Sequence, residues 1–461
     1  MAVLDKYTTV GDMPFFNGTR KFIQYICNPE AVSGCPVYAL DSFSILWAWG
    51  VDGSSYGVLG NGSASSSSVP VSVFGGPWKK IVCTGSSVLA LDTSSYVWAW
   101  GYNGNGQLGD NTTSNRSSPV SIGFKFLDII TSNSGTSYAL DASSYMWSWG
   151  YNSYGAVGDG TTTNRSSPVS VIGSRRWRLF PSIDGVLPSS GYIIALDYTS
   201  FAWAWGNAGN GYLGDYATRN RSSPVSVYQT SGVPNQWLKI NSYRAGLGGY
   251  MTDSSSYLWG WGTTFLGNTS VGGNLTSIPI SVMGANKYIK VMSFVPNSVG
   301  GTCNAAVDIS SYLWQWGYMG NNGNFITEAS PVSMNTLGHP VIPSTVNIWG
   351  DNNPTNTSTA LTIMALSSDT SQILAWGSNY YGEFGGSASG GSISAPATIT
   401  PISATFKNML IEPITLGAAC LAVDSSSNLW SWGTNAYYTG NTSSNPSFVG
   451  TQVPRLNVLG N

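Results

Sequence analysis

The sequence contains few charged residues for its length. Lys, Arg, Asp and Glu make up 9% of its 461 residues, against about 25% in a typical globular domain. The formal net charge is −2, and no run of like charges offers a surface to a nucleic acid or an anionic membrane. We therefore expect no nucleic-acid partner and a surface covered by Ser, Thr, Asn and Gly.

The chain also lacks the segments that direct a protein into or across a membrane. No apolar run approaches the roughly 18 residues of a membrane span, which predicts no membrane insertion. The first residues include Asp5 and Asp12 and show neither the basic start nor the apolar core of a secretory signal. A role outside the cell would then be reached by assembly into a particle that lysis releases.

Residues suited to catalysis or metal binding are scarce. The one histidine, His339 in Gly-His-Pro, has no neighbours that would orient it as a catalytic base. The five cysteines show no metal-binding spacing, so we interpret them as free packed thiols, with a Cys27–Cys35 disulfide across a loop as the alternative. We predict no catalytic, cofactor or metal site.

Paired carboxylates, as in glycoside hydrolysis, are the one enzymatic arrangement that folding can assemble from acids far apart in the chain. The acids outside the repeated positions described below include Glu328, Asp351, Asp369 and Glu383. Nothing in their spacing favours a pair. The sequence therefore predicts a protein that is not an enzyme.

Against these absences stands a repeat that covers nearly the whole chain. An apolar pair, Asp, three mostly small residues, an apolar residue and Trp-x-Trp-Gly recur eight times, with Ser in place of Asp and Leu in place of the first Trp in one copy. The second tryptophans of the eight copies are Trp49, Trp100, Trp149, Trp205, Trp261, Trp316, Trp376 and Trp432. A period of this length indicates a repeat architecture.

One copy shows the local structure that the repeat encodes. Residues 88–92 predict a strand, residues 93–95 a turn that the side chain of Asp92 caps, and residues 96–100 the returning strand. Trp98 and Trp100 then project from the same face of the hairpin because side chains alternate along a strand. A single hairpin cannot bury such a face, so the hairpins must stack against one another.

The rest of each unit supplies two further strands. Gly/Asn-rich loops such as residues 102–110 lead to Pro-containing strands such as residues 116–122, which suit a sheet edge. A fourth strand follows, as in residues 78–83 and 237–241. Four strands in about 55 residues predict one blade of a β-propeller. Within the loops, ion pairs are expected for Asp110/Arg116, Asp159/Arg165 and Asp215/Arg221.

The motifs Leu-Asp…Trp-Ala-Trp-Gly, Asn-x-x-Gly-Gln-Leu-Gly-Asp and Ser-Ser-Pro-Val resemble the repeat of the regulator of chromosome condensation family. That repeat is also found in a propeller-type bacterial β-lactamase inhibitor. The resemblance covers about residues 21–459 and implies a propeller, usually of seven blades. The eight units predict an all-β propeller of about eight four-stranded blades, with seven blades plus a divergent unit as the alternative.

We predict two segments in the chain. Residues 21–461 form a single propeller domain of eight repeats. Residues 1–20 form an N-terminal arm for docking or ring closure, because residues 7–10 resemble the strand that precedes a blade and would complete the last one.

Most tryptophans belong to the repeat or, like Trp78, Trp177 and Trp237, to a recurrent place before an apolar strand, so we assign them to the core. Few residues are left for a ligand or partner surface. The candidates lie in unit-specific loops: Arg175, Arg176, Arg178, Tyr318, Trp349, Tyr380, Tyr381, Tyr437 and Tyr438.

The function predicted from composition is binding or structural, on an extracellular particle. A bacteriophage virion fits best, as a tail-fibre, receptor-binding or capsid-decorating component, with other virion proteins or a host receptor or glycan as partners, and with self-association open. One alternative is a soluble, cytoplasmic protein-binding propeller of the enzyme-inhibitor or GTPase-regulator type, which the family resemblance allows. The other is a carbohydrate-binding lectin.

Overall fold

A computed structural model gives the fold of the chain. It describes residues 22–27, 36–52, 54–84, 86–178, 186–187, 191–209, 211–227, 236–242, 248–262, 276–282, 287–294, 303–321, 324–333, 347–350, 361–366, 373–378, 392–399, 406–414, 417–424, 429–433 and 447–452. The side chains that it places lie between residues 36 and 317, together with Leu374.

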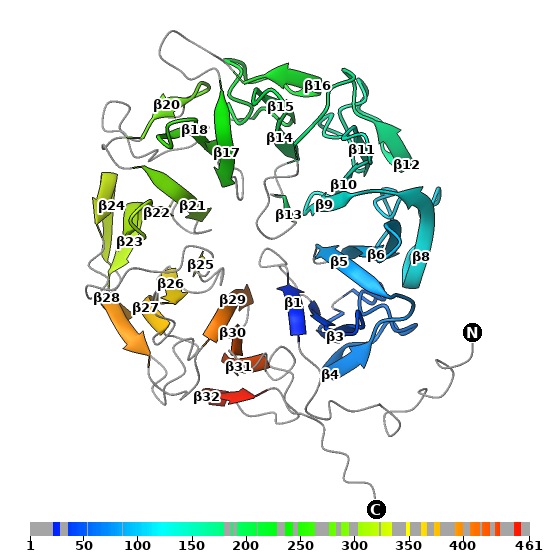
Figure 1. Ribbon diagram of the computed structural model, residues 1–461, viewed down its shortest axis with the longest axis horizontal. Helices are drawn as coiled ribbons and strands as arrows, with labels where there is room; N and C mark the ends of the chain where they lie inside the picture. Colours follow the sequence, from blue (N-terminus) through cyan, green and yellow to red (C-terminus); the bar gives the residue numbers. More distant parts are fainter. Residues whose placement is uncertain are drawn as a thin grey trace, which may run out of the picture.

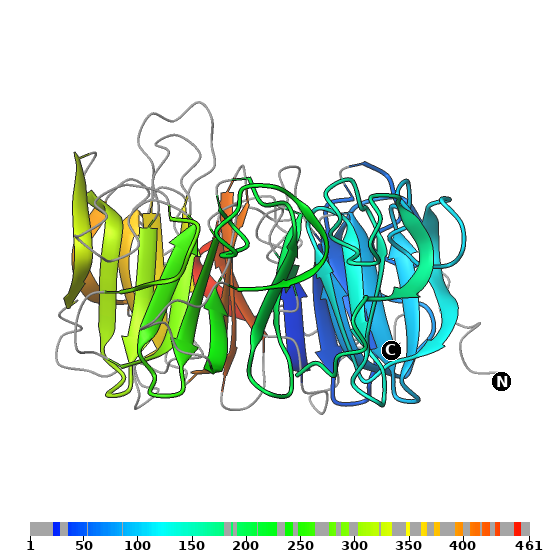
Figure 2. The same ribbon diagram turned by 90° about the horizontal axis from the view of Figure 1, so that it is seen from above.

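The described strands form eight sheets arranged around one axis, in chain order (Figure 1). Seen from the side, the ring is a disc whose strands run between its two flat faces (Figure 2). The chain is therefore an all-β propeller, and its eight sheets agree with the eight predicted blades. We number the blades 1 to 8 in chain order.

The first four blades contain these strands: β1 (Phe22–Cys27), β2 (Pro36–Asp41), β3 (Leu46–Gly50) and β4 (Ser67–Ser72); β5 (Trp78–Cys83), β6 (Ser87–Asp92), β7 (Tyr96–Gly101) and β8 (Arg116–Lys125); β9 (Asp128–Ser132), β10 (Thr136–Leu140), β11 (Met146–Gly150) and β12 (Arg165–Ser170), joined by β13 (Val186–Leu187); and β14 (Tyr192–Leu196), β15 (Ala202–Gly206) and β16 (Arg221–Ser226).

The last four blades contain these strands: β17 (Trp237–Ser242), β18 (Gly248–Asp253), β19 (Leu258–Gly262) and β20 (Ile280–Ser281); β21 (Tyr288–Phe294), β22 (Cys303–Asp308), β23 (Leu313–Asn321) and β24 (Asn324–Ser333); β25 (Asn347–Gly350), β26 (Leu361–Leu366), β27 (Ile373–Ser378) and β28 (Ser392–Ile399); and β29 (Phe406–Ile414), β30 (Gly417–Asp424), β31 (Leu429–Gly433) and β32 (Ser447–Gln452).

Within a blade the strands pair in sequence order, with the first nearest the axis and the fourth at the outer edge (Figure 1). The Pro-containing strands β4, β8, β12 and β16 are these outer strands. Proline is tolerated there because an outer strand needs hydrogen bonds on one side alone. The prediction of edge strands is confirmed.

The structure corrects the place of the fourth predicted strand of each unit. Residues 78–83 and 237–242 do not close the preceding blade but form the inner strands β5 and β17 of the following one. Each copy of the repeat begins at a hairpin. The sequence alone does not show whether the apolar strand that follows pairs with the preceding hairpin or with the next one.

Blade 4 departs from four strands. Trp177 begins its inner edge with one bridge to Asp197, where Trp78 of blade 2 starts a full strand against Asp92. Beyond Trp177, Val186 and Leu187 pair instead with β9 of blade 3, in the parallel direction. Blade 3 therefore has five strands and blade 4 three among the described residues.

In blades 2 to 5 the two tryptophans of the Trp-x-Trp pair have different partners. The first is held inside its own hairpin: Trp98 Nε1 donates to Asp92 Oδ2 at 3.0 Å. The second binds the preceding blade: Trp149 Nε1 donates to the carbonyl oxygen of Gln107 at 3.0 Å, and Trp205 Nε1 to that of Ala156 at 2.9 Å. One motif thus fixes both the hairpin and the contact between blades.

Apolar side chains between adjacent sheets form the core. Tyr38 and Leu40 of blade 1 pack with Trp78, Ile81 and Trp100 of blade 2, and similar clusters lie between the blades that follow. Burying one such side chain contributes about 2–3 kcal/mol. The assignment of Trp78, Trp177 and Trp237 to the core is confirmed, since each is at most 2% exposed.

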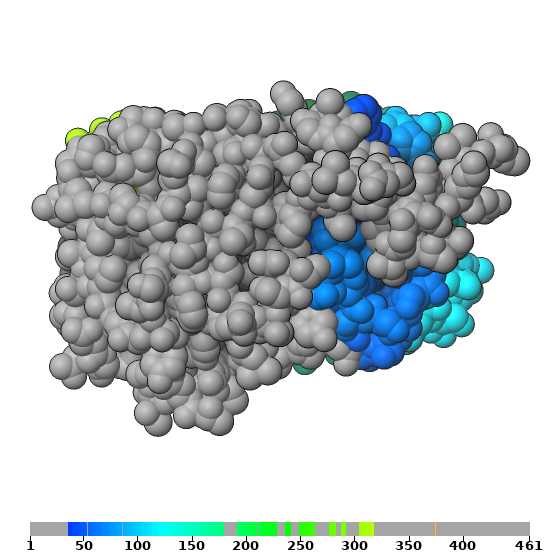
Figure 3. Space-filling model, turned by 90° about the horizontal axis from the view of Figure 1, so that it is seen from below, coloured from blue at the N-terminus to red at the C-terminus, as the bar shows by residue number. Residues whose placement is uncertain are grey.

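The ring closes where β1 of blade 1 lies beside β29 of blade 8. The described atoms of the first blades reach the rim of the disc, as Figure 3 shows.

The fourth strand of blade 8 is β32, whereas residues 1–20, for which ring closure or docking was predicted, lie outside the described residues. So does Cys35 of the Cys27–Cys35 alternative, while Cys83 is buried.

No helix in the described part of the chain is long and apolar enough to span a membrane.

Candidate interaction face

The hairpin turns between the second and third strands share one hydrogen-bond pattern. In the turn after β18, Asp253 Oδ1 accepts the backbone N–H groups of Ser255 at 2.8 Å and Tyr257 at 3.0 Å, and its Oδ2 accepts Trp259 Nε1 at 3.0 Å. The equivalent aspartates, with the same three kinds of donor, are Asp41, Asp92, Asp141, Asp197 and Asp308. These carboxylates are therefore used by the fold.

Each turn also receives the start of the next blade. The backbone N–H of Trp177 donates to the carbonyl of Ser144 at 2.8 Å, and that of Tyr288 to the carbonyl of Ser256 at 3.1 Å. Turns, connecting segments and inner-strand starts consequently lie together on one face of the disc. We call it the hairpin face; the loops between third and fourth strands form the opposite loop face.

Large apolar side chains gather on the hairpin face. Two of the most exposed are Tyr198 at 63% and Ile309 at 59%. Leu238 and Ile289 are exposed because a β-bulge at the start of β17 and β21 leaves each without a cross-strand partner. The described members of this set are Phe43, Tyr96, Leu127, Tyr145, Tyr198, Leu238, Tyr257, Ile289, Ile309 and Tyr312.

Basic side chains lie among these apolar ones. Lys125 Nζ is 4.5 Å from the centroid of the Tyr96 ring, and Lys287 Nζ is 5.6 Å from that of Tyr257. Lys125 ends β8 opposite Tyr96, and Lys287 immediately precedes β21, so each lysine lies beside the turn whose tyrosine it covers. Cation–π contacts of this kind orient both groups.

The three arginines predicted from sequence meet in blade 4 on the same face. The guanidinium of Arg175 lies 3.5 Å from the ring centroid of Trp203. Arg178 Nη1 donates to Ser200 Oγ at 3.3 Å and to the carbonyl of Leu238 in blade 5 at 3.5 Å. Arg176 is exposed, and its carbonyl accepts the N–H of Tyr198 at 3.0 Å.

Lys239 extends this basic group into blade 5. Its Nζ donates to the carbonyl of Ile289 in blade 6 at 3.3 Å, and burial lowers its pKa. Arg178 and Lys239 thus each reach forward to the inner strand of the following blade. Lys80 does the same in blade 2, but its partner is the carboxylate of Asp128.

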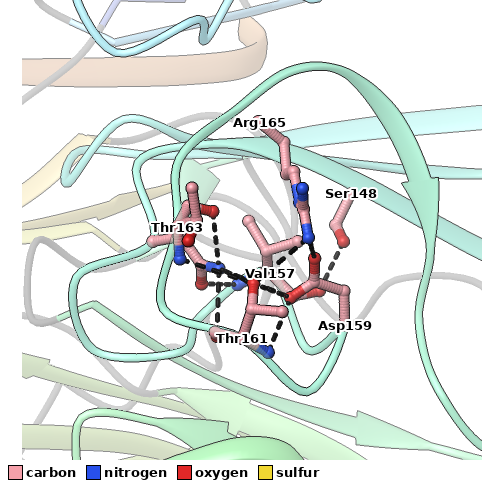
Figure 4. Close-up of polar contacts among 7 residues, drawn as sticks. Ser148, Val157, Asp159, Thr161, Thr163 and Arg165 are labelled. Carbon is pink, nitrogen blue, oxygen red and sulfur yellow. Dashed lines mark hydrogen bonds and ion pairs between the residues drawn. The ribbon is translucent and has the colours of Figure 1, made fainter.

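The loop face contains three ion pairs between Arg and Asp. Arg165 Nη2 lies 2.5 Å from Asp159 Oδ2, and Thr161 donates its backbone N–H and hydroxyl to Asp159 Oδ1 (Figure 4). Arg116 and Arg221 pair with Asp110 and Asp215 in the equivalent loops. All three predicted ion pairs are confirmed.

The described aspartates are hydrogen-bonded within the fold. Every aspartate whose side chain is described accepts hydrogen bonds within the fold, including Asp52, which binds the N–H groups of Tyr56 and Gly57. No three of His, Cys, Asp and Glu among the described residues lie close enough to hold a metal ion. Of the acids considered for glycoside hydrolysis, Glu328 is in β24, while Asp351, Asp369 and Glu383 lie outside the described residues, as does His339.

The predicted surface residues fall into three groups. Arg175, Arg176 and Arg178 lie together on the hairpin face. Tyr318 is in β23 and Trp349 in β25, and their side chains are not placed. The remaining candidates lie outside the described residues: Tyr380, Tyr381, Tyr437 and Tyr438.

Sequence reasoning missed the exposed tyrosines of the hairpin face. Tyr96, Tyr145, Tyr257 and Tyr312 each stand four residues after the turn aspartate. This four-residue spacing is visible in the sequence. Because side chains alternate along the returning strand, each tyrosine projects from the side of the hairpin opposite to the buried residue beside it. These tyrosines were assigned to the repeat and not to the surface.

Comparison with known families agrees with this geometry. Residues 95–139 and 145–179 match the regulator of chromosome condensation (RCC1) repeat. The first matched RCC1 repeat begins in a hairpin turn and spans β7 to β10, the two outer strands of blade 2 and the two inner strands of blade 3. The offset between RCC1 repeat and blade explains why units counted from sequence do not coincide with sheets.

Solved structures of other proteins share the fold. Human WBSCR16 superposes with a TM-score of 0.55 at 15% identity, covering 79% of this chain and 95% of that one. Prp20p from Saccharomyces cerevisiae gives 0.51 at 16% identity, with 81% and 90% covered. Yeast RCC1 (Prp20) bound to Kap60 gives 0.50 at 15%, with 99% and 91% covered. No curated protein sequence matches the chain.

Proposed function

We propose that this chain is a non-enzymatic protein-binding propeller that docks partners on its hairpin face. The observation that carries the proposal is the gathering of exposed apolar and basic side chains on that face, whereas Arg116, Arg165 and Arg221 of the loop face are paired with aspartates. Tyr and Arg are enriched at protein interfaces, and contiguous exposed apolar surface marks an interaction site.

The RCC1-type relatives support a protein partner. Prp20p is described with binding to Gsp1p and histones, and yeast RCC1 was solved bound to Kap60. The alternative predicted from sequence, a soluble protein-binding propeller, therefore has support that the particle hypothesis lacks. Neither the fold nor the comparisons support a virion role, and localisation at a particle surface or in the cytoplasm stays a prediction, as does the lectin alternative.

The test compares the two faces of the disc. Full-length protein is immobilised, and proteins captured from the producing cells are quantified for the parent chain and for two variants. Tyr198→Asp/Leu238→Asp changes the hairpin face, and Tyr154→Asp/Tyr216→Asp changes exposed residues of the loop face. We expect the first variant to lose its specific partners by about tenfold or more and the second to retain them.

Loss of the same partners by the loop-face variant, with retention by the hairpin-face variant, would contradict the proposal. Melting temperatures of both variants show that the fold is retained.

A further inference from the structure

The exposed hairpin face has one sector in which positive charge is concentrated. This sector consists of Arg176, Arg178, Tyr198, Leu238 and Lys239. Hydrogen bonds make it contiguous: the N–H of Tyr198 binds the carbonyl of Arg176, and Arg178 binds the carbonyl of Leu238. We refer to these five residues as the arginine sector.

None of its three cations forms an ion pair with a described carboxylate. Arg176 has no described side-chain contact. Arg178 uses Nη1 for Ser200 Oγ and the Leu238 carbonyl, so its remaining N–H groups stay available. Lys239 donates to a backbone carbonyl, which carries no net charge.

The carboxylate that adjoins Tyr198 in the sequence is buried. It belongs to Asp197, which is 9% exposed. Its Oδ1 accepts the N–H and hydroxyl of Thr199 and the N–H of Phe201, and its Oδ2 accepts Trp203 Nε1. The sector therefore exposes positive charge, while the carboxylate of Asp197 is buried and already hydrogen-bonded.

The apolar members decide which kind of anion would fit. Tyr198 is 63% exposed and Leu238 49%, and both stand between the cations. A carboxylate-rich peptide that also carries apolar side chains would satisfy the cations and cover this surface at once. A nucleic acid is disfavoured by the net charge of −2 over the whole chain, and a second copy docked through the same sector would set like charges together.

We propose that the arginine sector binds an acidic segment of a partner protein, through carboxylates held by Arg176, Arg178 and Lys239 and apolar side chains that contact Tyr198 and Leu238. This inference rests on the proposed function, because it specifies the chemistry of a partner on the hairpin face.

The test uses a fluorescent peptide of glutamates with interspersed phenylalanines, and its glutamine counterpart, with the full chain. We expect the glutamate peptide to bind about tenfold more tightly or better, and its affinity to fall as salt rises from about 0.05 M to about 0.3 M. Arg176→Gln/Arg178→Gln should weaken it about tenfold. Arg219→Gln, at an exposed position of the loop face, should leave it within about twofold.

Arg176→Gln alone keeps the test interpretable if loss of the Arg178 contact between blades disturbs folding. Equal affinity for the two peptides would overturn the inference. So would vesicles of anionic lipid or single-stranded DNA that bind as tightly with the same dependence on Arg176, or a dimer on a sizing column that Arg176→Gln abolishes.

The two proposals fail differently. If the acidic peptide does not bind but Tyr198→Asp/Leu238→Asp still removes captured partners, the hairpin face docks proteins that are not acidic. If that variant retains its partners, the proposed function itself fails.

Discussion

At the scale of single residues, the hydrogen bonds of the Asp and Trp side chains explain the repeat. The turn aspartate satisfies two backbone N–H groups and the first tryptophan, and the second tryptophan binds a carbonyl of the preceding blade. A glycine that the sequence places in a loop lies between blades 2 and 3. Gly109 has φ +76 and packs against the indole of Trp149.

Gly109→Ala should disturb the contact between blades 2 and 3. A Cβ there would lie 2.7 Å from Trp149 Nε1, so the indole would have to leave the Gln107 carbonyl. We expect this variant to lose about 3–4 kcal/mol of unfolding free energy, from the strained backbone together with displacement of a buried side chain. Urea unfolding followed by tryptophan fluorescence measures the loss.

Gly123→Ala is the matched control. Gly123 has a similar φ of +80, but a Cβ there meets nothing within 4 Å. The expected cost is therefore the backbone term alone, about 1–2 kcal/mol. Equal losses for the two variants would show that the close approach to Trp149 contributes nothing.

At the scale of elements, the loop of residues 151–164 is held by polar contacts rather than by regular structure. Asn152 Oδ1 accepts the N–H of Val157 at 2.8 Å, and Asp159 binds Thr161 and Arg165 (Figure 4). Burial alone would raise the pKa of Asp159, but these hydrogen bonds and the charge of Arg165 outweigh it and lower the pKa below 3.8. Asp110 shows the same direction for the same reasons.

Asp159→Asn should therefore reduce stability in a pH-dependent way. Because the folded pKa is lower than the unfolded one, ionised Asp159 stabilises the fold above about pH 4, and this contribution is lost as pH falls through the folded pKa. We expect the difference in unfolding free energy between the parent and Asp159→Asn to be largest at neutral pH and to shrink toward about pH 2. Urea titrations at several pH values measure it.

Thr162→Ala, at an exposed position of the same loop, controls for the substitution itself and should follow the parent profile. A stability difference for Asp159→Asn that does not vary with pH would rule out this role of the carboxylate.

At the scale of the whole molecule, stability depends on closing the ring. One face of the blade 1 sheet packs against blade 2 through Tyr38 and Leu40. Side chains alternate along its strands, so Val37, Trp47 and Trp49 project from the other face, yet they are at most 3% exposed. Because β1 lies beside β29, blade 8 covers that second face.

A chain that ends at residue 400 lacks β29–β32 and should expose Trp47 and Trp49. Each buried tryptophan contributes about 2–3 kcal/mol, so we expect the melting temperature to fall by about 10 °C or more, with a red shift of tryptophan emission. A chain that ends at Gln452 keeps β32 and should melt like the parent. An unchanged melting temperature of the shorter chain would show that blade 8 does not stabilise blade 1.

The sequence by itself determined the repeating parts of this protein. The Asp to Trp-x-Trp-Gly spacing, the Pro-containing edge strands and the Asp/Arg pairs depend on neighbours within one unit, so their pattern is local and readable. Eight copies of a hairpin that cannot bury its own face also require a ring of stacked blades.

Only the tertiary structure decided what depends on residues far apart in the chain. Residues 78–83 pair with the following hairpin and not the preceding one, and Val186 joins blade 3, because register is chosen by which sheet buries the apolar side chains. The candidate face likewise follows from folding. Arg176 and Arg178 were found as a basic cluster in sequence, but Leu238 comes beside Arg178 because blades 4 and 5 are neighbours in the ring.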